Sequence, residues 1–183
     1  GHPTRFSVVR YGNVVGSRGS VVPFFRRLID EGNDHIPITD ARMTRFWITL
    51  NQGVDFVFKS FQRMSGGEIF VPKIPSYLIT DLAKAISPSS KLVNVGIRPG
   101  EKLHEQMIGL EDSPYTYEYS DYFKILPSIN KWANDPERIG NGTKVDSNFT
   151  YCSDNNKDWM EISELKEWIE KNKHKIHLFF SIL

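Results

Sequence analysis

The stretch RYGNVVGSRGSVVPFF, Arg10 to Phe25, decides how the chain folds. The residues before it, RFSVV, are apolar and β-branched, which favours a buried strand that ends at Gly12. A glycine-rich turn follows, and Pro23 occupies a position that the first turn of a helix tolerates. Strand, glycine-rich turn and helix in this order are typical of nucleotide-binding folds, in which the turn approaches a phosphate.

The turn does not match the dinucleotide fingerprint, which requires G-x-G-x-x-G between strand and helix. Gly12, Gly16 and Gly19 are spaced G-x-x-x-G-x-x-G, and Val22 stands where a close-packing glycine would follow. Asp40 lies at the distance of a ribose-binding acid, but it ends a segment too short and polar for a second Rossmann strand. The sequence also contains no Y-x-x-x-K, so the usual proton-handling pair of hydride chemistry is absent from it.

Strands and helices alternate along the first part of the chain, which favours an α/β architecture with parallel strands. We expect strands at 5–12, 35–39, 68–72 and 91–97, and helices at 23–31 and 50–64. A third helix is expected to end at 86, with Thr80 and Asp81 as its caps. Segment 98–108 is predicted to be a loop that turns into a short helix. Further on we expect extended chain at 115–126, a polar loop at 130–156 and a helix from Ser163.

The composition is that of an ordinary globular protein, with 39% hydrophobic and 25% charged residues and a net charge of +1. This charge gives no global reason to expect nucleic acid or an anionic membrane as a partner. Nine of the ten arginines lie between Arg5 and Arg98, and arginine suits bidentate contacts to phosphate. Surface salt bridges are an equally good explanation for any one of them. Nucleic-acid binding is disfavoured because no basic cluster is interleaved with stacking aromatics.

Cysteine usage and the chain ends favour a cytoplasmic location. Cys152 is the single cysteine, and no Cys/His cluster suggests a metal site. The first residues lack the apolar region of a signal peptide. The apolar run within 172–183 is too short to span a bilayer, and could be a docking segment or a non-native extension. His104 lies in HEQM, which lacks the second histidine of a zinc-protease helix, so we interpret it as structural.

Five stretches together carry a resemblance to a known family: RYGNVVGSRGSVVPFF, PITDARMTRFWITLNQGVDF, GGEIFVPK, IRPGEKLHEQMI and YCSDNNKDWM. They closely resemble the inverting UDP-N-acetylglucosamine 4,6-dehydratases, which are extended short-chain dehydrogenase/reductase enzymes of polysaccharide biosynthesis. The resemblance covers nearly the whole chain and thins after about Lys171. It begins just after the place of the family's Y-x-x-x-K helix, so the chain resembles the carboxy-terminal half of such an enzyme.

The resemblance implies an α/β fold that is an incomplete Rossmann domain. Residues 1–129 would hold its last strands, interleaved with a small α/β substrate-binding domain, and 130–183 a polar loop, a helix and a tail. The family's cofactor glycine motif and its catalytic tyrosine and lysine have no counterpart here. An amino-terminal Rossmann half would therefore be the missing partner, and without it the paired parallel strands would leave apolar surface exposed.

The same resemblance implies which residues bind a UDP-sugar: Asn13, Ser17, Arg18, Val22, Arg45, Arg98 and Glu101. Asn13 would hydrogen-bond the sugar nucleotide, because an amide both donates and accepts. Val22 would press on the uracil or ribose, while Ser17 and Arg18 would belong to a loop that closes over the sugar. Tyr11 and Gly12 match positions that line the nicotinamide of NADP. A turn-capping asparagine and an apolar core residue are the structural alternatives for Asn13 and Val22.

Two arginines would bind the diphosphate. Arg45, in TRFWITL, and Arg98, in RPGEK, match the family's diphosphate arginines, and Glu101 matches an acid that binds the ribose hydroxyls. Both arginines are predicted to lie at junctions between a strand and a loop, where open α/β sheets bind ligands. Convergence of Arg45 and Arg98 on one cleft is therefore the expectation on which the interpretation depends.

In the complete enzyme, the resemblance implies an NADP-dependent lyase that acts as a homo-oligomer. NADP+ would take hydride from C4 of the sugar, the resulting ketone would acidify the C5 proton, water would leave from C6, and hydride would return to C6 with inversion at C5. The chain itself would hold no catalytic residue and no metal, and we expect it to be inactive alone. The alternatives are a non-catalytic module that binds a nucleotide-sugar or a partner chain, and a related nucleotide-sugar epimerase.

Overall fold

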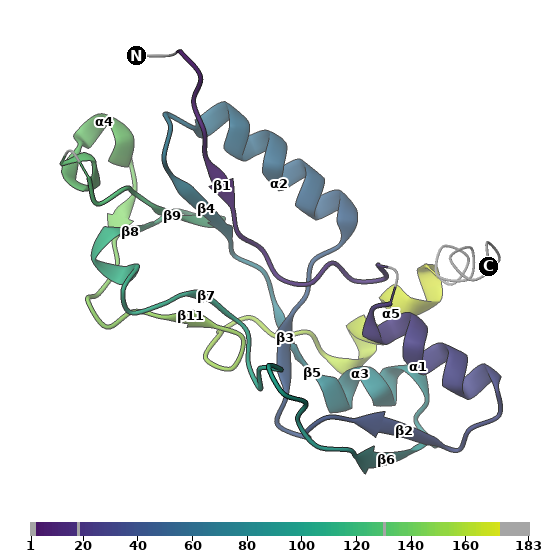
Figure 1. Ribbon diagram of the computed structural model, residues 1–183. Coiled ribbons are helices and arrows are strands. Elements are labelled where there is room, and N and C mark those ends of the chain that lie inside the picture. Colours follow the sequence, from purple (N-terminus) through teal and green to yellow (C-terminus); the bar gives the residue numbers. More distant parts are fainter. Residues whose placement is uncertain (1–2, 18, 130, 173–183) are drawn as a thin grey trace.

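The computed structural model describes residues 3–17, 19–129 and 131–172, and its largest sheet is mixed (Figure 1). Two strands in this sheet are parallel, β1 (Val8–Val9) and β4 (Ile69–Pro72). Antiparallel strands extend the sheet beyond β4 in the order β9 (Tyr122–Ile125), β8 (Thr116–Glu118) and β10 (Thr143–Lys144). The predicted α/β class is confirmed, with parallel pairing in only part of the fold.

Helix α2 (Leu50–Arg63) covers one face of this sheet. Thr49 begins it with a capping box, in which the hydroxyl accepts from the Gln52 backbone and the Gln52 side chain accepts from the Thr49 backbone. The helix buries Gly53, Phe56 and Ser60, which are three or four positions apart and so lie on one face. Phe56 packs in a cluster with residues of β4 and β9.

A second, smaller unit lies around a two-stranded parallel sheet of β2 (His35–Ile38) and β6 (Lys91–Asn94). Three helices share its core: α1 (Val21–Asp30), α3 (Ile79–Ile86) and α5 (Ile162–Lys171). Two antiparallel pairs connect it to the larger sheet, β3 (Thr44–Phe46) with β5 (Ser76–Leu78), and β7 (Gln106–Ile108) with β11 (Tyr151–Cys152). Short helices complete the fold: η1 (Ser113–Tyr115), η2 (Trp132–Asn134) and α4 (Pro136–Ile139).

Two predictions of local structure are wrong, and in both a contact distant in sequence decides the outcome. Thr80 and Asp81 do not cap α3, which begins at Ile79 directly after β5. The Ile79 N–H donates to the Met43 carbonyl at 3.0 Å, so the residue just before β3 satisfies the helix start in place of a side-chain cap. Segment 98–108 forms no helix, because its last three residues pair with β11.

Other predicted boundaries are close to those observed. Helix α1 ends at Asp30, and Gly32 has φ +85°, as expected of the glycine that follows a helix. Helix α5 begins one residue before the predicted Ser163, at Ile162. The predicted polar loop at 130–156 contains η2, α4, β10 and β11, which are all short.

An exposed apolar surface follows α2 and β1. We call it the open apolar face and define it as Phe6, Val8, Leu50, Val54, Val57, Phe58 and Phe61. Val54, Phe58 and Phe61 recur at helical spacing in α2, but these side chains do not face the sheet: Phe58 and Phe61 are 65% and 71% exposed. Within the described residues, no strand pairs with the second edge of β1.

Among the residues that the structure describes, no helix has the length and apolar character needed to cross a membrane.

Candidate functional site

A cleft of about 660 Å³ opens at the carboxyl ends of the parallel strands. Asn13 enters it a few residues after β1, Thr39 directly after β2, and Val95 and Gly96 directly after β6. The first turn of α1 forms another wall, with Val22 buried against the core. The carboxyl ends of β2 and β6 share one edge because the strands are parallel, and ligands of open α/β sheets bind at this edge.

Five of the seven residues predicted to bind substrate line this cleft: Asn13, Val22, Arg45, Arg98 and Glu101. Arg45 and Arg98, 53 positions apart in the sequence, thus share one cavity. Ser17 is exposed in the turn before α1 and is not among the lining residues. Arg18 lies outside the described residues. The geometry therefore brings together the predicted diphosphate and ribose residues, and leaves Ser17 outside the lining.

Tyr11 and Gly12, the residues predicted to line a nicotinamide, lie outside the cleft lining. Gly12 has a packing reason to be glycine, because a Cβ there would lie 2.7 Å from the Cβ of buried Phe46. Tyr11 is 39% exposed and lies against α2, where a Cβ on Gly53 would come within 3.9 Å of its ring. The close approach at Gly12 aligns the chain so that Asn13 enters the cleft.

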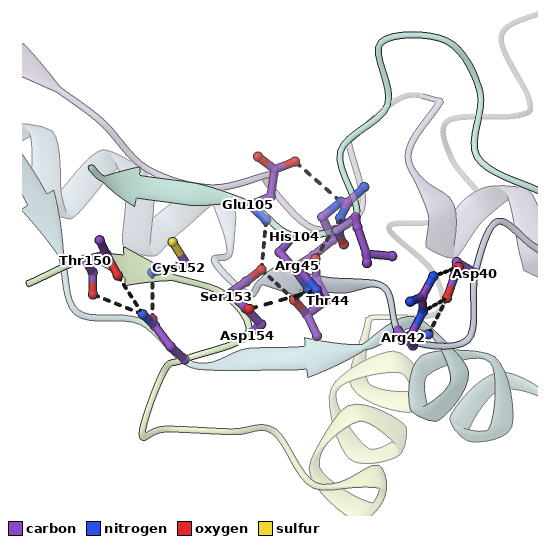
Figure 2. Close-up of polar contacts among 12 residues, drawn as sticks. Asp40, Arg42, Thr44, Arg45, His104, Glu105, Thr150, Cys152, Ser153 and Asp154 are labelled. Atoms are coloured by element: carbon purple, nitrogen blue, oxygen red, sulfur yellow. Dashed lines mark hydrogen bonds and ion pairs between the residues drawn. The ribbon is translucent and has the colours of Figure 1, made fainter. Parts of the chain in front are cut away.

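Arg45 lies on β3 and is tied to the segment that follows Arg98 (Figure 2). Its Nη1 donates to the carbonyls of Thr44 at 2.7 Å and Leu103 at 3.0 Å, and its Nη2 donates to the carbonyl of Lys102 at 2.8 Å. The Nε lies 3.4 Å from a Glu105 carboxylate oxygen, and the side chain is only 12% exposed. Arg45 therefore both lines the cleft and holds part of its wall.

Arg98 is presented to the cleft by a turn that Glu101 organises. The Glu101 N–H donates to the Arg98 carbonyl at 3.0 Å, and its carboxylate accepts from the Arg98 N–H at 3.2 Å. The other carboxylate oxygen accepts from the Thr39 hydroxyl at 3.3 Å. The Arg98 guanidinium is exposed and makes no hydrogen bond or ion pair with the described residues, so it is available to an anion.

Arg42 lies nearby but serves another purpose. Its guanidinium and backbone N–H donate to Asp40 at 2.8 to 3.0 Å, apart from the Arg45 contacts (Figure 2). These hydrogen bonds lower the pKa of Asp40 to about 2. Arg42 is therefore paired at the surface and is not among the residues that line the cleft.

Sequence reasoning missed several lining residues, of which Thr39, Gly96 and Tyr77 are the most informative. Thr39 and Gly96 follow parallel strands, so the rule that ligands bind at carboxyl ends of such strands could have indicated them. Tyr77 gave no such signal, because it lies within β5 and packs edge-on against Trp47. Burial raises the pKa of Tyr77 to about 12, so its phenol is neutral at physiological pH.

The sequence of the chain is similar to a known protein family and to several of its relatives. Residues 1–127 match the family described as Polysaccharide biosynthesis protein. The inverting UDP-N-acetylglucosamine 4,6-dehydratase of Campylobacter jejuni is 57% identical over 171 residues, which are 91% of this chain and 51% of that protein. A UDP-glucose 4-epimerase from Rickettsia canadensis is 34% identical over 90% of this chain and 49% of that protein. The predicted resemblance to the inverting dehydratases is confirmed.

A solved structure has a similar fold, and this chain again covers about half of it. The X-ray structure of Pen from Bacillus thuringiensis superposes with a TM-score of 0.77 at 32% sequence identity, over 92% of this chain and 51% of that one. The chain thus spans about half the length of the relatives that it matches.

Proposed function

Because this chain belongs to the polysaccharide biosynthesis protein family, we propose that its cleft binds the UDP portion of a UDP-sugar. The chain would be the substrate-binding half of a UDP-N-acetylglucosamine 4,6-dehydratase. One observation carries the proposal: Arg45 and Arg98, from separate elements, line the same cavity at the carboxyl ends of parallel strands. A diphosphate there would receive charge-assisted hydrogen bonds from the Arg98 guanidinium and from the one N–H of Arg45 that its protein contacts leave over.

The remaining lining residues suit the rest of the nucleotide. Val22 and the neighbouring residues of α1 offer an apolar wall for a uracil ring, while Glu101 and Thr39 place acceptor oxygens where ribose hydroxyls could donate. Asn13 brings an amide that both donates and accepts. A cleft with apolar walls and a few convergent polar groups is the usual form of a small-molecule site.

The choice of dehydratase over epimerase rests on similarity. Identity to the dehydratase of Campylobacter jejuni is 57%, against 34% to the epimerase of Rickettsia canadensis. The names of the dehydratase and of the epimerase both include a UDP-sugar, so the proposal that the cleft binds UDP is the same for either enzyme. The chemistry performed on the sugar is the part that only a turnover assay decides.

We further propose that the complete enzyme uses NADP and that a separate, amino-terminal half holds it. The described residues do not themselves fit a dinucleotide: Tyr11 is exposed, Gly12 is required by Phe46, and the glycine turn leads into the cleft. The residues of this chain would bind and orient the sugar nucleotide.

The open apolar face is the surface that such a half would cover. No strand of the described residues pairs with the second edge of β1, so a strand of the amino-terminal half could pair there. The exposed side of α2 would then lie beside the helix that covers that added strand. This proposal is supported by the chain's length, which is about half that of its relatives.

Titration with UDP and with uridine tests the proposed site. If two arginines bind the diphosphate, UDP should bind at least about tenfold more tightly than uridine, since a hydrogen bond to a charged group contributes about 1.5–3 kcal/mol. Isothermal calorimetry or ligand-detected NMR would measure both affinities. Equal affinities for the two ligands would show that the cleft does not recognise the diphosphate.

A further inference from the structure

Three segments meet beside the cleft at the hydroxyl of Thr44, on β3 next to Arg45 (Figure 2). The Thr44 Oγ1 lies 2.8 Å from the His104 Nδ1 and 2.7 Å from the Ser153 Oγ. Thr44 is 3% exposed and Ser153 is fully buried. Since neither hydroxyl reaches solvent, each depends on these partners for its hydrogen bonds.

The direction of this hydrogen-bond chain follows from one backbone group. The Glu105 N–H donates to the Ser153 Oγ at 2.9 Å, so Ser153 must send its own proton elsewhere. Its other partner is the Thr44 Oγ1, which in turn is left to donate to the His104 Nδ1. The direction Glu105 to Ser153 to Thr44 to His104 satisfies every buried hydroxyl proton, and it requires the His104 tautomer whose Nδ1 carries no proton.

This hydrogen-bond chain holds the carboxyl-terminal end of the segment that Arg45 binds. The carbonyls of Lys102 and Leu103 accept from the Arg45 guanidinium, and the next two residues are His104 and Glu105. A backbone bond adds to the tie, because the Thr44 N–H donates to the Leu103 carbonyl at 3.2 Å. The segment follows directly on the turn that presents Arg98, so its position affects both arginines of the cleft.

We propose that Thr44 is a positioning residue for diphosphate binding: its hydroxyl, between His104 and Ser153, fixes segment 102–105 and thereby orients Arg45 and the Arg98 turn. Thr44 does not line the cleft, so it acts through these residues and not by contact with the ligand. The inference rests on the proposed function, because it assigns a role within the same UDP site.

Two substitutions at Thr44 distinguish the effect of its hydroxyl from the effect of its side-chain shape. Thr44→Val keeps the branched shape and removes the hydroxyl, and we expect it to weaken UDP binding roughly fivefold while uridine binding stays unchanged. Thr44→Ser keeps the hydroxyl and should stay within about twofold of the unchanged chain. Calorimetric or NMR titration measures the affinity of each variant for UDP and for uridine, and each value is compared with that of the unchanged chain.

A matched control is Thr116→Val. Thr116 is fully buried and its hydroxyl donates to the Asp112 carbonyl at 2.7 Å, but it lies outside the cleft lining. Its substitution should lower the melting temperature without changing the ratio of UDP to uridine affinity. If Thr44→Val fails to fold, Ser153→Ala removes the other hydroxyl of the chain and should give the same selective loss.

A double-mutant cycle with Arg45→Ala distinguishes the possible failures. If Thr44 acts through Arg45, Thr44→Val should add little to the loss in UDP affinity that Arg45→Ala causes alone. An unchanged UDP affinity in Thr44→Val, or an equal loss for UDP and uridine, would overturn the positioning role and leave the proposed function standing. If Arg45→Ala and Arg98→Ala both leave UDP binding unchanged, the proposed function itself fails.

Discussion

Arg98→Ala is expected to weaken UDP binding about tenfold, with no effect on uridine binding. The Arg98 guanidinium is free of partners within the described residues, so its loss leaves no buried group unsatisfied and should not lower stability. Ten-fold is the lower end of what a charged hydrogen bond contributes, because the side chain is exposed and salt screens it. The loss should shrink as ionic strength rises.

Arg42→Ala is the matched control for charge. It removes an arginine only three positions from Arg45, but one that is paired with Asp40 and does not line the cleft. Calorimetric titration at low and high salt should show UDP affinity within about twofold of the unchanged chain, since exposed charges contribute little at a distance. Equal losses from Arg42→Ala and Arg98→Ala would mean that net charge, and not a site at Arg98, attracts UDP.

Turnover should depend on an amino-terminal half. We expect the chain alone to convert no detectable UDP-N-acetylglucosamine, and a polypeptide that joins the amino-terminal half of the Campylobacter jejuni relative to this chain to convert it. The general acid and base groups of such chemistry typically contribute about 10²–10⁴-fold each, so their absence should remove activity altogether. Detection of the dehydrated sugar by mass spectrometry measures the outcome, and turnover by the chain alone would contradict it.

The open apolar face supplies a structural test of the same prediction. Phe58→Glu places a carboxylate at a side chain that is 65% exposed in this chain and would be covered in the assembled enzyme. It should reduce the affinity between separately produced halves at least about tenfold, since burial of an unpaired charge is costly. Leu110→Glu, on an exposed residue outside the open apolar face, should leave assembly and turnover unchanged. If the halves bind with equal affinity in both variants, another surface joins them.

Much of the fold follows from local sequence. Helix α1 with its terminal Gly32 and helix α2 are predicted close to their observed positions, and the strand expected at 5–12 is present at Val8–Val9 alone. Their signals are local: β-branched residues, a proline in a first helical turn, and a repeat of three to four residues. The sequence does not reveal which apolar side of α2 faces the sheet, because that depends on elements far along the chain.

The errors have one physical cause, which is tertiary contact. Thr80 and Asp81 look like helix caps, yet the Met43 carbonyl satisfies the N–H group at Ile79. Segment 98–108 has helix-forming residues, yet its last three residues pair with β11. Arg45 in addition donates to the carbonyls of Lys102 and Leu103, which holds this part of the segment in a non-helical conformation. Such contacts are formed only once distant strands are in place, so local patterns cannot anticipate them.

Residues named through the resemblance, such as Arg45 and Arg98, line one cleft, while Thr39 and Tyr77 were found only in the structure. The structural task of Arg45 was also unforeseen, since nothing in TRFWITL indicates that its guanidinium would hold Lys102 and Leu103. Family motifs indicate which residues gather at a ligand, but not the contacts that hold them in place.

The most direct test of the site is a titration of the isotope-labelled chain with UDP, followed at each backbone amide by NMR. The account predicts that the largest shifts occur at residues around the cleft, among them Asn13, Thr39, Gly96 and Glu101. It is contradicted if no amide shifts at millimolar UDP, or if the shifts gather on α2 and spare the cleft.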